Sequence, residues 1–228
     1  MNKLILTFLV MLSTSALYAQ ESFYKMPNGK IIDQTTYQKV KENLGKNGKV
    51  EELIITKIIR NDSIIITPKL NVLTQKDQNG NYIDPYGEQK KLIGTRFPIE
   101  KFKNHKGVNY AKTFLNGKPS LINFWFTTCV PCLAEIPVLN NLEAGLKDKV
   151  NFLAITFEQQ QTVNSFLKHS TYKFQQITNA QQQLNELKVV AYPINFILNK
   201  DGIIIDVYGE ISNSEKQLMD MLKELLVF

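Results

Sequence analysis

The second half of the chain alternates between short apolar segments and segments of helical periodicity, and this pattern limits the fold more than any other feature. Apolar runs of strand length occupy 120–126, 150–157, 194–198 and 203–208. Segments with helical spacing occupy 130–146, 163–168, 180–188 and 214–226. Strands that alternate with helices, followed by a hairpin with Asp201-Gly202 in its turn, predict an α/β fold with a mixed central sheet.

Residues 20–91 have a different pattern and predict a small α+β region of unknown function. A helix is expected at 34–44, and two strands at 50–60 and 63–69. Pro68 predicts that the second strand ends there or lies at a sheet edge, because proline has no N–H for the ladder. The polar stretch 75–91 predicts a linker, so we expect the α/β domain to span 92–228.

The first residues are typical of an export signal. Lys3 precedes the apolar run 4–12, and small residues lead to a plausible cut after Ala19. This run is shorter than the roughly 18 to 20 residues that a membrane-spanning helix needs. We therefore expect a signal peptide at 1–19 and a periplasmic or extracytoplasmic protein, with an uncleaved signal anchor as the alternative.

The charge pattern argues against nucleic-acid binding. The chain has 27 basic and 21 acidic residues, for a net charge of +6. The basic residues are scattered, and no run is longer than Lys90-Lys91. A nucleic-acid footprint would gather them in a patch or stripe, so a solvated surface is the favoured interpretation.

The only two cysteines, Cys129 and Cys132, lie two residues apart in the segment FWFTTCVPCLAEIP. A disulfide across so short a loop would stabilise the fold very little. Structural zinc needs about four ligands, and neither His105 nor His169 has zinc-finger spacing. A redox pair is the favoured interpretation, and we expect neither a metal nor a cofactor.

The position of the pair suits thiol–disulfide exchange. The cysteines fall where a strand ends and a helix begins, which places Cys129 at the helix N-terminus. The N–H groups there stabilise a thiolate and lower its pKa. Pro131 fits the first helical turn. We expect an exposed Cys129 that attacks and a more buried Cys132 that resolves the mixed disulfide.

Glu135 lies three residues after Cys132, on the same side of the predicted helix. A partly buried carboxyl there would have a raised pKa and could exchange a proton with Cys132. The alternative is an ordinary solvent-facing helix glutamate.

The segment 124–137, with Phe124-Trp125, the two cysteines, Glu135 and Pro137, resembles the active site of exported TlpA/ResA-type thioredoxin-like proteins. The similarity covers about 92–228. It includes a lead-in at 94–118, which is a short strand pair in the family, and Tyr192-Pro193 before the strand 194–198. The resemblance implies a thioredoxin fold and thiol-disulfide oxidoreductase activity.

The resemblance also implies roles for individual residues. Cys129 would be the nucleophile, Cys132 the resolving thiol and Glu135 the active-site glutamate. A cis bond at Pro193 would let Tyr192 present backbone groups to an extended segment of a partner. We expect Tyr192, Pro193, Thr128 and Trp125 to contact the substrate, and Trp125 would either shield the sulfurs or belong to the core.

Two positions depart from related patterns. Asn123 stands where many thioredoxins have a buried Asp, and it cannot exchange a proton, which leaves Glu135 as the only nearby acid–base candidate. Thr128 stands where Trp commonly precedes the first Cys, at the rim where a substrate would bind.

The sequence thus predicts an extracytoplasmic thiol-disulfide oxidoreductase. We expect it to reduce disulfides of a protein substrate and to receive electrons from a membrane-borne thiol reductant. The alternatives are a peroxiredoxin-like thiol peroxidase and a non-catalytic envelope binding module with a vestigial CxxC, which the unexplained region 20–91 would favour.

Overall fold

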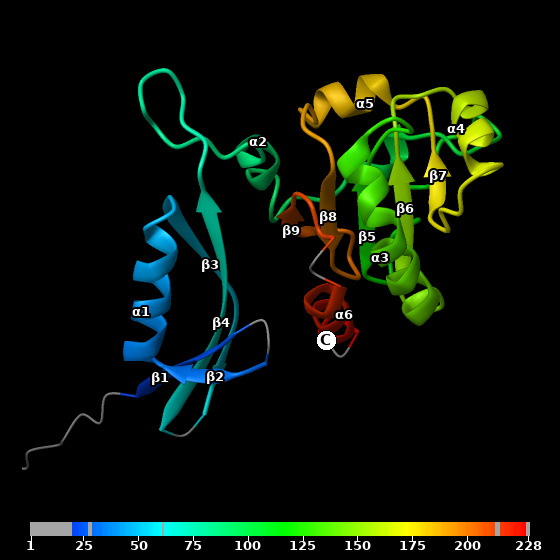
Figure 1. The fold of residues 1–228 in the computed structure, drawn as a ribbon. Coiled ribbons are helices and arrows are strands. Elements are labelled where there is room, and N and C mark those ends of the chain that lie inside the picture. The colour runs from blue at the N-terminus through cyan, green and yellow to red at the C-terminus, as the bar shows by residue number, and fades with distance from the viewer. Residues whose placement is uncertain (1–19, 27–28, 61, 213–214, 227–228) are drawn as a thin grey trace, which may run out of the picture. The chain divides into compact units, whose positions relative to one another are not determined.

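The computed structural model describes residues 20–26, 29–60, 62–212 and 215–226. The chain divides into two compact units, Met1–Thr74 and Gln75–Phe228 (Figure 1). The second unit includes the segment 75–91, for which the sequence predicted a linker. The predicted signal peptide at 1–19 lies outside the described residues. None of the helices in the described part of the chain is long and apolar enough to cross a membrane.

The first unit is a four-stranded sheet with one helix packed on it. Its elements are β1 (Glu21–Lys25), β2 (Ile31–Asp33), α1 (Gln34–Gly45), β3 (Lys49–Ile59) and β4 (Ser63–Leu73), and the strand order is β2-β1-β4-β3. The carboxylate of Asp33 caps α1 by accepting a 2.8 Å hydrogen bond from the N–H of Thr36. The core of the unit is small, and the rings of Tyr24 and Tyr37 stack in it with centroids 3.8 Å apart.

The prediction for Pro68 was wrong. Strand β4 lies between β1 and β3 and runs through Pro68 to Leu73. The register of β3 against β4 shifts between Ile54 and Thr56, directly opposite Pro68. This irregularity lets the strand continue past a residue that has no N–H to donate.

The second unit is built on a mixed five-stranded sheet of order β7-β6-β5-β8-β9. Strands β5, β6 and β7 are parallel, whereas β8 pairs antiparallel with both β5 and β9. The strands are β5 (Ser120–Phe124), β6 (Asn151–Ile155), β7 (Gln175–Ile177), β8 (Ile194–Leu198) and β9 (Ile204–Tyr208). The mixed α/β fold predicted from the sequence is confirmed.

Helices surround this sheet (Figure 1). They are α2 (Gly87–Lys90), α3 (Val130–Leu146), α4 (Gln160–Leu167), α5 (Gln181–Glu186) and α6 (Glu215–Glu224), with a 3₁₀ turn η1 (Ile99–Lys101). Helices α3 and α6 contact each other. The predicted hairpin joins β8 to β9, where Gly202 has a φ of +74° that other residues rarely adopt.

The two faces of the sheet carry different side chains. Along β5, Ile122 and Phe124 belong to a large apolar cluster, and along β8 the same cluster includes Phe196. Side chains alternate along a strand, so Asn123 and Asn195 point to the opposite face. These two residues are direct cross-strand partners, and both are fully buried.

The lead-in at 94–118 differs from the expected strand pair. In the structure it contains η1 and two isolated bridges, Arg96 with Ile203 and Lys103 with Asn109. Phe97, Ile99 and Phe102 are buried in the apolar cluster. The segment therefore covers the apolar face of the sheet with side chains instead of extending the sheet with strands.

Candidate functional site

The cysteines and the Tyr192-Pro193 pair lie at the same end of the sheet. Strand β5 ends at Phe124, whose antiparallel partner is Ile194, the first residue of β8. The residues that follow β5 are therefore neighbours of those that precede β8. The peptide bond between Tyr192 and Pro193 is cis, as the resemblance implied.

Cys129 caps helix α3, as the sequence predicted. Its backbone is extended, and its sulfur accepts a 3.2 Å hydrogen bond from the N–H of Cys132. Pro131 occupies the first turn. The two sulfurs are joined in a disulfide. Cys129 therefore stands at a helix N-terminus, a position that stabilises negative charge.

The prediction of an exposed Cys129 is wrong for this disulfide form. Cys129 is 4% exposed, which is close to the 1% of Cys132. The neighbouring Val130 is 76% exposed, and Thr128 and Pro131 are exposed as well. The surface around the disulfide therefore comes from these three residues, which flank and separate the cysteines.

Glu135 is fully buried, so the solvent-facing alternative is excluded. Burial raises the pKa of its carboxyl to about 7, and the nearby charge of Glu210 acts in the same direction. Hydrogen bonds from the backbone N–H of Ile211 and from the amides of Asn195 and Asn123 partly oppose this rise. The net result is a carboxyl that changes its charge near neutral pH, one helical turn after Cys132.

Two amide side chains contact this carboxyl, and a tyrosine hydroxyl contacts one of the two amides. The amide nitrogens of Asn123 and Asn195 donate to Oε2 of Glu135 over 3.3 and 3.4 Å. Asn123 also donates to the side-chain oxygen of Asn195 over 2.9 Å. The hydroxyl of Tyr172 donates to Oδ1 of Asn123 over 2.8 Å. Every member of this cluster is buried.

Trp125 is fully buried. Its ring packs against Phe166 of α4 and edge-on against Tyr172, with centroids 5.2 and 5.1 Å apart. Of the two roles predicted for Trp125, this position favours packing in the core, and the prediction that it contacts a substrate is corrected.

Partly buried aromatic rings join the cysteine loop to the loop of the cis-proline. Tyr192 packs edge-on against Phe126 with centroids 5.3 Å apart, and Phe157 packs against both. The backbone N–H of Cys129 donates to the carbonyl of Phe126 over 3.1 Å. The position of Phe126 is thus coupled both to the first cysteine and to Tyr192.

Glu158 is a second carboxyl beside this loop, and the sequence analysis did not identify it. It accepts hydrogen bonds from the backbone N–H of Thr127 at 2.7 Å and from the Thr127 hydroxyl at 2.8 Å. It follows β6, whose C-terminal end lies beside that of β5. Glu158 is therefore a further carboxyl near the cysteine loop, where it binds Thr127, and Glu135 stays the predicted acid–base candidate.

Tyr172 and Asn195 were also missed. Asn195 carried a usable signal, since it is the one polar residue in the apolar strand INFIL. Tyr172 precedes β7 in a polar stretch and carried no such signal.

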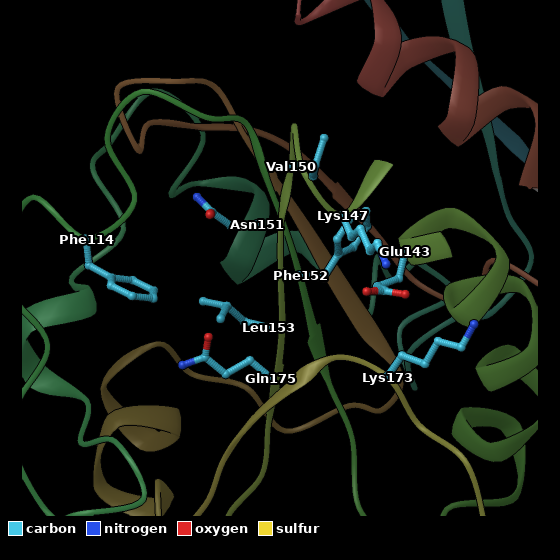
Figure 2. A pocket seen from close by; sticks show the side chains of 9 residues that line it. All are labelled: Phe114, Glu143, Lys147, Val150, Asn151, Phe152, Leu153, Lys173 and Gln175. Carbon is cyan, nitrogen blue, oxygen red and sulfur yellow. The ribbon is translucent and has the colours of Figure 1, made fainter. Parts of the chain in front are cut away.

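A surface pocket of about 220 Å³ lies elsewhere on this unit (Figure 2). It is lined by the first residues of β6, by Glu143 near the C-terminal end of α3 and by Lys147 directly after that helix. The cysteines stand at the N-terminus of α3, so the pocket is at the opposite end of that helix. It contains none of the predicted site residues.

Known proteins with similar sequences or folds support this site. A family model described as Redoxin matches residues 92–223. The thiol-disulfide oxidoreductase ResA of Bacillus thuringiensis subsp. konkukian is 30% identical over 142 residues, covering 60% of this chain and 81% of that protein. The thiol:disulfide interchange protein DsbE of Pseudomonas fluorescens biotype C is 31% identical over 133 residues, covering 57% and 73%.

A solved structure shows the same fold. The thioredoxin domain of a thiol-disulfide oxidoreductase from Bacteroides vulgatus superposes with a TM-score of 0.50 at 17% identity, covering 57% of this chain and 97% of that one. The range matched by the Redoxin model, 92–223, contains both cysteines, Glu135 and Pro193. The chain therefore belongs to the Redoxin family and is a ResA-like thiol-disulfide oxidoreductase with a thioredoxin fold.

Proposed function

We propose that this protein reduces disulfides of other proteins outside the cytoplasm. The observation that carries the proposal is the Cys129–Cys132 disulfide at the N-terminus of α3, with the buried carboxyl of Glu135 one turn further along the helix. A disulfide that closes so short a loop adds little stability. Its placement on a helix N-terminus instead favours exchange chemistry.

The reaction starts from the reduced dithiol. The Cys129 thiolate attacks one sulfur of the substrate disulfide, which forms a mixed disulfide and releases the first substrate thiolate. Cys132 then loses its proton and attacks the sulfur of Cys129, which closes the Cys129–Cys132 disulfide and releases the second substrate thiolate. Two electrons pass from the dithiol to the substrate, and each released thiolate takes up a proton.

Glu135 is proposed to accept the proton of Cys132. Its pKa of about 7 lies where a carboxyl can both take up and release a proton at neutral pH. In the reverse step, reduction of the disulfide, it would return that proton to Cys132. Glu135 thus serves both directions of the cycle.

Substrate docking is proposed at the rim of the site. Backbone groups of Tyr192 and Pro193 would pair with an extended segment of the substrate, next to the exposed Thr128. Thr128 has only a small side chain at this rim, and we propose that it leaves room for the segment that carries the target disulfide.

The location and the electron donor belong to the same proposal. The signal-like residues 1–19 would direct export, and residues 20–91 and 92–228 would form the mature N-terminal region and the thioredoxin-like domain. A membrane-borne thiol reductant would restore the dithiol after each turnover. The similarity to ResA and DsbE proteins supports this part of the proposal.

The test is reduction of insulin by the purified, pre-reduced protein. Cys129→Ser should abolish it, and Cys132→Ser should accumulate a mixed disulfide that non-reducing gels resolve. Ala144→Ser, at an exposed position near the other end of α3, is the matched control and should retain activity. Insulin reduction by Cys129→Ser at the wild-type rate would refute the proposal.

A further inference from the structure

Tyr172, Asn123 and Asn195 form a continuous row of hydrogen bonds beneath the active site, here called the amide row. The row begins at the hydroxyl of Tyr172, passes through Asn123 to Asn195, and ends at the carbonyl of Gly209. The last hydrogen bond, from the Asn195 amide to Gly209, is 3.1 Å long. The residues come from two strands and two loops that the fold brings together.

The orientation of the two asparagine amides is fixed at the Gly209 end of the row. The backbone carbonyl of Gly209 can only accept, so the amide nitrogen of Asn195 must face it. The oxygen of Asn195 then faces Asn123 and requires a donor, which is the Asn123 amide nitrogen. The oxygen of Asn123 is left facing Tyr172, whose hydroxyl completes the row as its first donor.

With this orientation, both amides present their nitrogens to the carboxyl of Glu135. Both amide nitrogens point at Oε2 of its carboxyl, and the N–H of Ile211 donates to Oε1. The carboxyl therefore receives three donors, which suits the ionised form and leaves no acceptor in the row for a proton on Oε2.

The groups that face Glu135 otherwise oppose its ionisation. Glu210, beyond β9, adds a negative charge nearby. Burial raises the pKa values of Tyr86 and Tyr172, and the charge of Glu135 raises them further. The two cysteines carry no charge because they are joined in the disulfide. Within the described residues, Glu135 forms no ion pair with a lysine or arginine. The donors of the row and of Ile211 are therefore what holds its charge.

We propose that Tyr172, Asn123 and Asn195 are positioning residues that hold two N–H donors on Glu135 and thereby set the pH at which it exchanges its proton. Tyr172 acts without touching the carboxyl, because it satisfies the oxygen of Asn123 and so keeps the opposite end of that amide on Glu135. The proposal deepens, and rests on, the proposed role of Glu135 as the proton carrier of Cys132.

The experiment is a ¹³C NMR titration of the Glu135 carboxyl in the oxidised full-length protein, with its signal assigned by loss in Glu135→Gln. Tyr172→Phe leaves the oxygen of Asn123 without its donor. The charged form of Glu135 is then held less well, and the titration midpoint should rise by about half to one pH unit. Asn195→Ala removes a direct donor and should raise the midpoint at least as much.

Tyr110→Phe is the matched control. Tyr110 is also buried, and its hydroxyl accepts a 2.8 Å hydrogen bond from Gln175, away from the amide row. The midpoint of Glu135 should stay at the wild-type value in this variant. Equal midpoints in the wild type, Tyr172→Phe and Asn195→Ala would overturn the proposal.

If the variants do not fold, an NMR titration of the unmodified protein tests whether the two amides contact the carboxyl of Glu135. The side-chain amide protons of Asn123 and Asn195 should shift with the same midpoint as the Glu135 carboxyl. Amide signals that ignore this titration would overturn the proposal. These titrations are independent of turnover: coupled midpoints together with a Cys129→Ser variant that still reduces insulin would refute the proposed function and leave the amide row standing.

Discussion

The two faces of the five-stranded sheet are built from the same strands but from different kinds of side chain. On one face, Ile122 and Phe124 of β5 pack with Phe196 of β8 in the large apolar cluster. On the other face, one residue away along each strand, Asn123 and Asn195 bond to each other and to Glu135. The comparison separates what stabilises the fold from what serves its chemistry.

The comparison shows where the fold buries a group whose burial costs free energy. Apolar burial stabilises a domain in proportion to the area removed from water, and the large cluster on the apolar face supplies this burial. Burying a carboxyl costs free energy unless donors satisfy it. The polar face of the sheet meets that need with two asparagines, which are direct cross-strand partners and both donate to Glu135.

The largest expected effect comes from damage to the apolar face. Phe196→Ala removes a ring that packs 4.9 Å from the Phe124 ring and edge-on to Phe97. The cavity should lower the free energy of unfolding by about 3 to 5 kcal/mol. Urea unfolding followed by the fluorescence of the single tryptophan, Trp125, measures it.

Phe196→Leu is its control, because it keeps most of the volume and should cost less than about 1.5 kcal/mol. The Glu135 titration should not move in either variant. A shifted titration in a folded Phe196 variant would show that the two faces are not separable.

The second effect lies on the polar face and depends on pH. The pKa of Glu135 is about 7 in the folded protein and ordinarily 4.5. A carboxyl whose pKa is raised by folding gives stability that is fully present below pH 4.5 and is lost as the pH rises through 7. This difference corresponds to about 3 kcal/mol, at about 1.4 kcal/mol per pKa unit.

Glu135→Gln should remove this loss. The difference in unfolding free energy between variant and wild type should therefore change by about 3 kcal/mol in favour of the variant between pH 4.5 and 8. Ala144→Gln, at an exposed position of the same helix without a titrating side chain, should differ from the wild type by an amount that does not change with pH. Parallel stability curves for Glu135→Gln and the wild type would contradict the proposed state of this carboxyl.

The smallest expected effect concerns the cysteine loop, which joins β5 to α3. Thr127→Val removes the hydroxyl that donates to Glu158 but leaves the backbone hydrogen bond. The loss should be about 1 kcal/mol of unfolding free energy. Thr128→Val changes the exposed neighbour by the same chemistry and should stay within about 0.5 kcal/mol. Equal effects of the two substitutions would mean that Glu158 does not hold the loop.

The local features of the site could be predicted from the sequence. Helix α3 has the predicted bounds of Val130–Leu146, and β8 those of Ile194–Leu198. Both have local signals, namely a cysteine and a proline at a helix start and a short apolar run. The cap at Cys129 and the burial of Glu135 follow from the same segment.

The rest depends on contacts between distant parts of the chain. The strands β2 and β7 have three residues each, too few to show a period. The partnership of Asn123 with Asn195 exists only because β5 and β8 pair in one register. The continuation of β4 through Pro68 depends on an irregularity in its partner strand, which no pattern in β4 itself could reveal.

The most direct measurement is the ionisation of Glu135 in the intact oxidised protein, by ¹³C NMR of labelled glutamate across pH 3 to 9. Burial of the carboxyl and the nearby charge of Glu210 raise its pKa, the surrounding donors partly oppose this rise, and the predicted midpoint is about 7. A midpoint at the ordinary value near 4.5 would show a carboxyl that is already ionised throughout the working range. It would then be a weaker base for the proton of Cys132 and could not hold and return that proton at neutral pH, which would contradict its proposed role as proton carrier.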